Sequence, residues 1–246
     1  MEKSLKNFSE CYQRHRKQNG IDLLQGETKL IGNEPFKIFD KNNNCVAKLN
    51  FKEVSKEIGL EIQDKLHYIH SARQDTKHHF GLFIEGKDYP ICYAALSEDI
   101  REYQIYGLES INKINTTNTI VMTRAFGFSK LPKNTMSKFF QRIKKEISSN
   151  TNNLVIVTAL NPLLGFKGSI FLGASYIPYM LSPLKYHYDQ NGCYLTRRAL
   201  KDRVVEQQIK TPPIVWLARG LKTFVQKGLE SNNNMKLISK NDYDKK

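Results

Sequence analysis

Residues 119–160 read TIVMTRAFGFSKLPKNTMSKFFQRIKKEISSNTNNLVIVTAL, and the fold is predicted from this stretch. It begins with an apolar run of strand type (119–128) and continues into a segment (135–148) whose apolar residues recur every three or four positions, as on one face of a helix. The run 154–160 is almost continuously apolar, which is typical of a strand buried on both faces. A strand, a helix and a strand in this order predict neighbouring parallel strands joined by a crossover helix.

The segments on either side extend this pattern. Upstream, apolar residues spaced by three and four predict a helix over 51–71, and two alternating runs at 78–84 and 89–96 predict a hairpin. Downstream, a short helix is expected, followed by two strands over roughly 176–188 and 193–198 that meet at a turn. The order predicts an α/β fold with a central mixed sheet and flanking helices.

We expect the chain to divide into three parts. Residues 1–50 are predicted to form a basic N-terminal extension, weakly structured over 1–34 and with a hairpin over 36–51. Residues 51–198 form the α/β domain. Residues 199–246 are predicted to form a basic tail with two weak helices, the second of which includes Trp216 and Val225, and a disordered end.

Composition limits the classes of protein that need consideration. The chain has 246 residues, 40% of them hydrophobic, which is enough for a folded core. The 38 Lys and Arg residues against 24 Asp and Glu give a net charge of +14, which favours an anionic partner unless it reflects a general compositional bias. No apolar run is long enough for a membrane helix, the N-terminus lacks a signal-peptide pattern, and the four cysteines match no zinc or redox spacing. These features predict a cytoplasmic protein with reduced thiols.

The junction between the first strand and the helix predicts an anion site. Unpaired backbone N–H groups and the positive end of the helix dipole favour a negative charge at a helix N-terminus. The alternative is an ordinary helix cap with solvated lysines, since the glycine-rich turn of many phosphate loops is missing. The residues predicted to hold the anion are Lys130, Lys133, Asn134, Thr135, Ser137 and Lys138.

Two stretches, VMTRAFGFSKLPKNTMSKFFQRIKKEI and NLVIVTALNPLLGFKGSIFLGASYI, resemble the GNAT superfamily of acyl-CoA N-acyltransferases. More narrowly, they resemble phage proteins of the Mom type, which modify adenine in DNA. The resemblance covers about residues 51–198. The matching features are Arg124 within the strand, the Pro-x-Asn-x-x-Ser loop at 132–137, the buried strand at 154–158, the Gly-x-x-Gly at 165–168, and LHYIHS at 66–71.

The resemblance implies an acyl-CoA-dependent N-acyltransferase. Acetyl-CoA or another acyl-CoA is the implied cosubstrate, with its pyrophosphate on residues 130–138 and its pantetheine arm between the separating strands 119–128 and 154–160, beside Thr158. A backbone N–H on one of these strands would polarise the thioester carbonyl, and the amine would attack without a covalent enzyme intermediate. The expected catalytic residues are His67 and Arg124, which match features of the family, and Tyr176, a nearby tyrosine.

The sequence departs from the Mom-type pattern at two positions. The Asp expected just after the buried strand is absent, and the corresponding stretch ends in Asn161. Phe171 stands where the family tends to have a Tyr able to protonate the leaving thiolate. Tyr176, Tyr179 and Tyr186 are the nearby tyrosines that could take this role.

The histidines and Arg124 can each be interpreted in two ways. His67 and His70 lie three apart on the predicted helix, and His78 and His79 follow, so these histidines could supply a general base or metal ligands. The alternative is that they are partly buried polar residues, and we predict no metal site. Arg124 either has a partner for its buried guanidinium or points outward from a sheet edge.

Basic residues near the C-terminus predict contacts with a nucleic-acid backbone, with Trp216 as a stacking group. A solvated helix face or attachment to a membrane surface is the alternative. The predicted nucleic-acid contacts are Arg197, Arg198, Arg219 and Lys222.

Three functions are therefore considered. The first is an N-acyltransferase whose acceptor amine belongs to a nucleic-acid base, and the second is a non-catalytic DNA- or RNA-binding protein on the same fold. The third is a small-molecule or protein acetyltransferase in which the positive charge is incidental.

Overall fold

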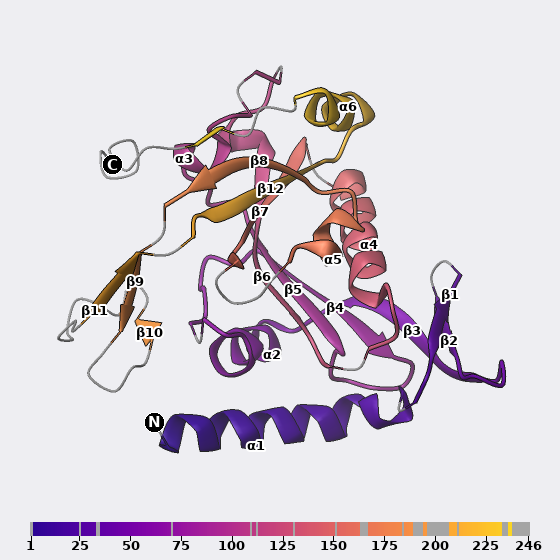
Figure 1. Cartoon of the computed structure of the whole chain (residues 1–246). Helices are drawn as coiled ribbons and strands as arrows, with labels where there is room; N and C mark the ends of the chain where they lie inside the picture. Colours follow the sequence, from indigo (N-terminus) through magenta and orange to yellow (C-terminus); the bar gives the residue numbers. More distant parts are fainter. Residues whose placement is uncertain are drawn as a thin grey trace.

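The computed structural model describes residues 2–24, 26–32, 35–69, 71–108, 110–111, 113–129, 131–150, 152–162, 167–183, 185–188, 194–195, 207–210, 212–232 and 236–237 (Figure 1). The helices are α1 (Glu2–Asn19), η1 (Ile21–Leu24), α2 (Lys56–Glu61), the π-helical turn η2 (Ile62–Leu66), α3 (Glu102–Ile105), η3 (Thr116–Asn118), α4 (Thr135–Asn150), α5 (Ser169–Leu172) and α6 (Thr223–Ser231). The strands are β1 (Lys29–Ile31), β2 (Phe36–Phe39), β3 (Cys45–Glu53), β4 (His78–Ile84), β5 (Cys92–Ser97), β6 (Thr119–Gly127), β7 (Val155–Leu160), β8 (Ile177–Ser182), β9 (Lys185–Tyr188), β10 (Tyr194–Leu195), β11 (Gln207–Lys210), β12 (Ile214–Gly220) and β13 (Lys236–Leu237).

Ten of these strands form one sheet in the order β1-β2-β3-β4-β5-β6-β7-β12-β8-β13. Neighbouring strands are antiparallel except for the parallel pairs β6–β7 and β8–β13. Strands β9, β10 and β11 form a separate small antiparallel sheet. The predicted α/β fold, a central mixed sheet with flanking helices, is confirmed, and α4 is the crossover between the parallel strands β6 and β7.

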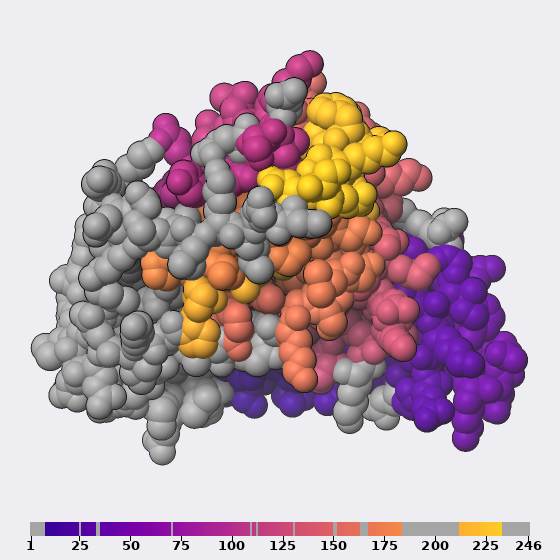
Figure 2. Space-filling model, turned by 45° about the horizontal axis from the view of Figure 1, so that its top comes forward, coloured from indigo at the N-terminus to yellow at the C-terminus, as the bar shows by residue number. Residues whose placement is uncertain are grey.

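The paired parts of strands β6 (119–122) and β7 (155–158) are buried on both faces, as the nearly continuous apolar run 154–160 predicts for β7. Ile120 and Ile156 belong to the core cluster that includes Phe139 and Ile143 of α4. Their neighbours in sequence point the other way, into a second cluster that α6 and residues from the segment 100–114 complete. Figure 2 shows α6, in yellow, against the magenta segment around α3 on the surface. Because side chains alternate along each strand, the two strands contribute residues to two hydrophobic cores, one on each side of the sheet.

The N-terminal segment differs from the prediction of a weakly structured extension, because residues 2–19 form the helix α1. Figure 1 shows α1 running across one end of the sheet, beside α2. Among the side chains of α1 that the structure describes, the buried ones are Cys11, His15 and Asn19, which recur every four residues on one face. Two of these three residues are polar, so the buried stripe is hidden from a search for apolar periodicity.

The C-terminal segment also differs from the prediction. The second predicted tail helix, around Trp216, is instead the strand β12, and the helix α6 begins only at Thr223. Strand β12 lies between β7 and β8 and pairs with β7 over residues 215–220 and with β8 over residues 214–218. Its β-branched and aromatic residues favour a strand. At Gly220 a Cβ atom would lie 2.4 Å from the backbone nitrogen of Gln226, so only glycine fits between the strand and α6. The sheet consequently continues across both predicted boundaries, at residues 50 and 198.

The helix predicted over 51–71 is shorter than expected. Strand β3 continues to Glu53 in register with β4, and α2 begins after the Ser55 cap, whose side chain accepts a hydrogen bond from Ile58 N. The helical turns end at Leu66, so His67 follows them in an extended conformation.

Both predicted hairpins, β2–β3 and β4–β5, are present. The strand predicted over 176–188 is instead divided into β8 and β9, which lie in different sheets, and a register shift interrupts the pairing of β8 with β12 near Pro178. Among the described helices, none combines the length and the apolar character needed to cross a membrane.

Candidate functional site

The strands β6 and β7 pair over only part of their length. Their parallel register joins residues 119–122 to residues 155–158 and ends there. Beyond that point β6 continues to Gly127 alongside β5, and β7 continues alongside β12. The two strands thus form a fork, and the separation implied by the family resemblance is present. The fork opens into a cleft of about 960 Å³ lined by both strands, the N-terminus of α4, and α5.

A β-bulge lies at the point of separation. On β5, Ala95 faces Arg124 and Leu96 faces Met122, so Thr123 is the extra residue on β6. A bulge bends its strand and increases the local twist, which turns β6 away from β7. The Thr123 hydroxyl donates to the Ala95 carbonyl at 3.3 Å and fixes the bulge to β5. On β7, the buried Thr158 hydroxyl donates to the Met122 carbonyl at 3.0 Å. Met122 and Thr158 are the last pair of residues before the two strands separate.

The N-terminus of α4 opens onto the same cleft. Residues 132–135 form a turn in which Thr135 N donates to the Pro132 carbonyl, and Asn134 has a left-handed φ of 69°. Asn tolerates that conformation better than most residues, and it replaces the glycine of other turns of this type. The N–H of Lys138 makes the first helical bond, to the Asn134 carbonyl. The N–H groups of Met136 and Ser137 therefore precede any intrahelical acceptor and are suited to an anion.

The predicted anion-binding side chains have different environments. The Thr135 hydroxyl donates to the Pro132 carbonyl at 2.7 Å, and the Ser137 hydroxyl donates to the Ile170 carbonyl at 3.0 Å, so both hold the loop in place. The Lys138 ammonium donates to the Gly32 carbonyl at 3.1 Å, next to β1. Lys133 and Asn134 are exposed and line the cleft. Lys130 lies outside the described residues.

The structure brings His67 and Arg124 to the same cleft. His67 is buried, and its Nδ1 accepts a hydrogen bond from Ile69 N at 3.3 Å. The proton of the neutral ring is then on Nε2. The Arg124 guanidinium is partly buried and donates to the carbonyls of Thr123 and Ser71. Arg124 thereby braces the bulge against the segment that follows His67.

Tyr176 does not line the cleft. Its ring is fully buried and packs edge-on against Phe140 and Phe171, which are themselves part of the cleft wall. Burial raises the pKa of the Tyr176 phenol strongly, and its hydroxyl has no hydrogen-bond partner within the described part of the chain. The structure therefore separates Tyr176 from the other two predicted catalytic residues.

The cleft wall combines apolar and basic groups. Asn161, at the position of the family Asp, lines the cleft and is buried. The described lining residues include no Asp or Glu, whereas Arg124, Lys133 and Lys167 are present. The sequence did not predict the apolar part of the wall, because its side chains cannot be distinguished from core residues by sequence pattern. These are Phe126, Phe128, Leu131, Met136, Phe140 and Leu160.

Arg219 and Lys222, two of the predicted nucleic-acid contacts, were expected on one helix and instead lie on β12 and at the start of α6. Arg219 is on β12, partly buried, and its Nε and Nη1 atoms are buried without hydrogen-bond partners among the described residues. Burial lowers the pKa of the Arg219 guanidinium. The Lys222 ammonium donates to the Ser148 carbonyl at 3.4 Å, near the end of α4. Burial also lowers the pKa of Lys144, and the neighbouring charges of Arg219 and Lys222 add to this effect. The other two predicted contacts, residues 197 and 198, lie outside the described part of the chain.

Comparisons with known proteins place the chain near acetyltransferases of known structure only at low similarity. No protein-family model matches, and no curated protein matches. The chain is similar to the aminoglycoside acetyltransferase AAC(6')-Ib in complex with coenzyme A and kanamycin, at 10% identity over 74% of this chain and 99% of that one, with a TM-score of 0.44. It is also similar to the spermidine N-acetyltransferase of Vibrio cholerae in complex with CoA and spermine (6% identity, 72% and 98% coverage, TM-score 0.42) and to an N-acetyltransferase of Staphylococcus aureus (13%, 70% and 97%, TM-score 0.39).

Proposed function

We propose that this protein is an acyl-CoA-dependent N-acyltransferase of the GNAT type. The observation that supports the proposal most directly is the fork between β6 and β7 with the N-terminus of α4 at its mouth. A cosubstrate that combines a pyrophosphate with a long, narrow arm ending in a thioester suits this combination of an anion site and a slot. Acetyl-CoA or another acyl-CoA has that shape and charge.

The pyrophosphate would bind at the N-terminus of α4. The N–H groups of Met136 and Ser137 and the positive end of the helix dipole attract an anion there, and the exposed Lys133 adds a positive charge. The hydroxyls of Thr135 and Ser137 already bond to backbone carbonyls, so their role is to hold the loop. The pantetheine arm would then lie between the strands, against the apolar cleft wall.

The unpaired arm of β6 would bind the reacting thioester. Beyond Met122 the described chain gives β6 no strand partner on its β7 side, so backbone N–H groups of residues 123–127 on that side can donate to the carbonyl oxygen. These donors stabilise the oxyanion that forms when the acceptor amine attacks the carbonyl carbon. The C–N bond forms, the C–S bond breaks, and the thiolate of CoA leaves. The amine loses one proton and the thiolate gains one.

His67 and Arg124 are the proposed polar groups at the reacting centre, since both line the cleft. With its Nδ1 accepting from Ile69 N, a neutral His67 carries a proton on Nε2 and can donate a hydrogen bond to the leaving thiolate, which takes up its proton from the attacking amine or from water. Tyr176, one of the three tyrosines considered for the leaving thiolate, is buried behind Phe171, so His67 is the proposed polar group beside the sulfur instead. Arg124 would orient the acceptor.

Acetyl-CoA binding tests the proposal. Isothermal titration with acetyl-CoA should show one site per chain, and Ser137→Ala combined with Lys133→Ala should weaken binding about tenfold or more. Asn134→Gly serves as the matched control, because glycine keeps the left-handed backbone at 69° that alanine would strain. If the full-length protein binds no CoA ester, the enzyme proposal is wrong.

A nucleic acid is the acceptor we favour, as in the Mom-type proteins that the sequence resembles. The cleft wall carries Arg124, Lys133 and Lys167 and, among its described residues, no carboxylate, while the chain as a whole has a charge of +14. Such a wall repels a polycationic amine and attracts an acceptor with phosphates. Residues Arg197, Arg198, Arg219 and Lys222 stay proposed as backbone contacts.

The acceptor class is tested separately. Release of free CoA from acetyl-CoA should depend on added duplex or single-stranded DNA, and DNA binding should weaken steeply with salt. Turnover with spermidine or an aminoglycoside in place of DNA would point to a small-molecule acetyltransferase. DNA binding with no CoA release would point to a non-catalytic binding protein.

A further inference from the structure

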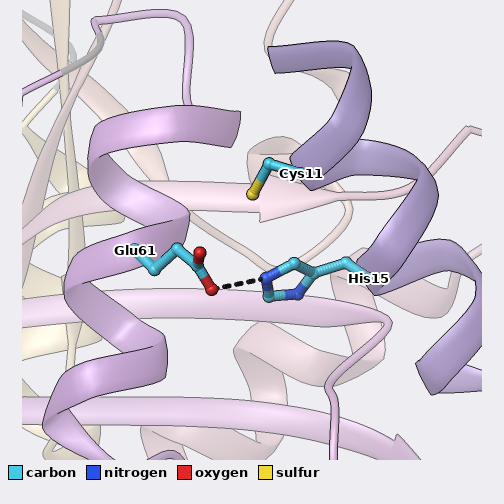
Figure 3. Close-up of side chains that lie close together, drawn as sticks. All are labelled: Cys11, His15 and Glu61. Carbon is cyan, nitrogen blue, oxygen red and sulfur yellow. Dashed lines mark hydrogen bonds and ion pairs between the residues drawn. The ribbon is translucent and has the colours of Figure 1, made fainter. Parts of the chain in front are cut away.

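Three side chains able to bind a metal ion meet where α1 packs against α2, away from the cleft (Figure 3). Cys11 and His15 come from α1, and Glu61 is the last residue of α2. One ligand atom from each lies within 4.8 Å of the other two. We propose that these residues form a structural site for Zn²⁺ that fastens α1 to the body of the protein.

The arrangement suits a transition metal of the zinc type. Cys11 and His15 are four residues apart on one helix, so both side chains project from the same face, and Glu61 approaches from the facing helix. A thiolate, an imidazole and a carboxylate are the three kinds of ligand that Zn²⁺ takes in proteins, and water can complete a tetrahedron. Mg²⁺ and Ca²⁺ prefer all-oxygen sites, so the sulfur and nitrogen donors favour zinc over either ion.

The two carboxylate oxygens of Glu61 have different partners. Oε1 accepts from Arg14 and from Lys65, the latter at 3.2 Å. Oε2 faces His15 Nε2 at 3.0 Å. An ion bound through Oε2 would replace only the bond to His15, while Arg14 and Lys65 would keep Oε1 in place. Hydrogen bonds to the outer side of a ligating carboxylate are a common feature of metal sites.

The positive charges of Arg14 and Lys65 oppose a divalent ion, but Arg14 also contributes to the site. Burial and the charge of Glu61 raise the pKa of the Cys11 thiol, and the hydrogen bond that Arg14 Nη2 donates to Cys11 Sγ at 3.8 Å offsets part of that increase. Binding releases the thiol proton of Cys11 to solvent, so the new thiolate and the Glu61 carboxylate together place two negative charges against the two positive charges of the ion. Affinity is therefore expected to increase with pH.

The surroundings separate this cluster from solvent. His15 is 0% exposed and Cys11 is 3% exposed, whereas the Glu61 side chain is 21% exposed. The ring of Tyr89 covers His15 edge-on at 4.6 Å. An ion would enter beside Glu61 and then be enclosed, which is typical of a structural site rather than a catalytic one.

Cobalt substitution provides the direct test. The reduced, chelator-treated full-length protein is titrated with CoCl₂, and a thiolate-to-cobalt charge-transfer absorption should appear and saturate at one ion per chain. ZnCl₂ should displace the cobalt. Zinc at a hundredfold excess over its dissociation constant should raise the melting temperature by about 5–10 °C, because only the folded state assembles the three ligands.

Matched variants assign the signal to this cluster. Cys11→Ser should abolish the absorption and the zinc-induced rise in melting temperature, with circular dichroism confirming that it folds. Glu61→Gln should weaken zinc about tenfold or more while leaving the thiolate absorption. The double variant Cys45→Ser/Cys193→Ser should behave like the parent, since it retains Cys11. A parent protein without the absorption, or a signal that survives Cys11→Ser, would overturn the proposal.

Discussion

The strands β6 and β7 each have a paired half and a forked half, and the two halves differ in role. In the paired half, residues 119–122 and 155–158 bond to each other and are buried on both faces. In the forked half, among the described residues, β6 pairs only with β5 and β7 pairs only with β12, and both strands line a cleft. Both halves are rich in apolar residues. The difference shows that strand pairing, set here by a bulge at Thr123, decides which apolar residues form the core and which form a site.

Matched side-chain truncations on β7 are expected to give the largest difference in stability between the two halves. Ile156→Ala, in the paired half, should lower the free energy of unfolding by about 2–5 kcal/mol, because Ile156 is fully buried and a cavity would remain. Leu160→Ala, four residues along in the forked half, should cost only about 1 kcal/mol, because Leu160 borders the cleft. Urea denaturation of both variants measures the difference. Equal losses would mean that the fork is packed as tightly as the core.

A smaller effect is expected where the two halves meet. Thr158→Val removes the hydroxyl that bonds the Met122 carbonyl at 3.0 Å, and should cost about 1–2 kcal/mol of unfolding free energy. Thr119→Val is the matched control, because the Thr119 hydroxyl is also buried and donates to a carbonyl, that of Asn115 at 2.7 Å, at the opposite end of β6.

The two threonine variants should be similar in stability but not in binding. Only Thr158→Val is expected to weaken acetyl-CoA binding, measured by isothermal titration, because only Thr158 fixes the angle of the fork. The same loss of affinity in Thr119→Val would show that the fork responds to strain anywhere along β6.

The sequence predicted the strand, helix and strand around this fork because each is a long, strongly periodic or continuous apolar segment. The resemblance also implied the separation of the strands. The bulge could not be predicted, because Thr123 becomes the extra residue only through its register with β5, a segment some thirty residues upstream. The place of β12 between β7 and β8 was missed for the same reason, since a late segment fills a gap that only tertiary structure creates.

The candidate site was predicted in part. Lys133, Asn134, His67 and Arg124 reach the cleft, and each stood out in the sequence as a polar residue in a family motif or an apolar context. Tyr176 was misplaced, because burial of a tyrosine depends on what packs above it, and here Phe171 does. Cys11 and His15 gave no signal, since their third partner, Glu61, lies far along the chain.

The smallest expected effect concerns how the stability of each half depends on pH. Beside the paired half, Ser97 of β5 faces Val121 and donates to Asp75. Hydrogen bonds from Arg73, with a smaller contribution from Ser97, lower the pKa of Asp75 to about 2.

Because the pKa of Asp75 is lower in the folded state than in the unfolded state, its contribution to stability is present above pH ~4 and is lost as the pH falls toward 2. Urea denaturation between pH 5 and pH 2 should therefore show a shallower decrease in unfolding free energy for Asp75→Asn than for the parent. Ser97→Ala should fall between the two, because it removes only the weaker hydrogen bond. The forked half has no carboxylate among its described lining residues, so Leu160→Ala should follow the pH profile of the parent. A changed profile in Leu160→Ala would mean that the two halves are coupled through the bulge.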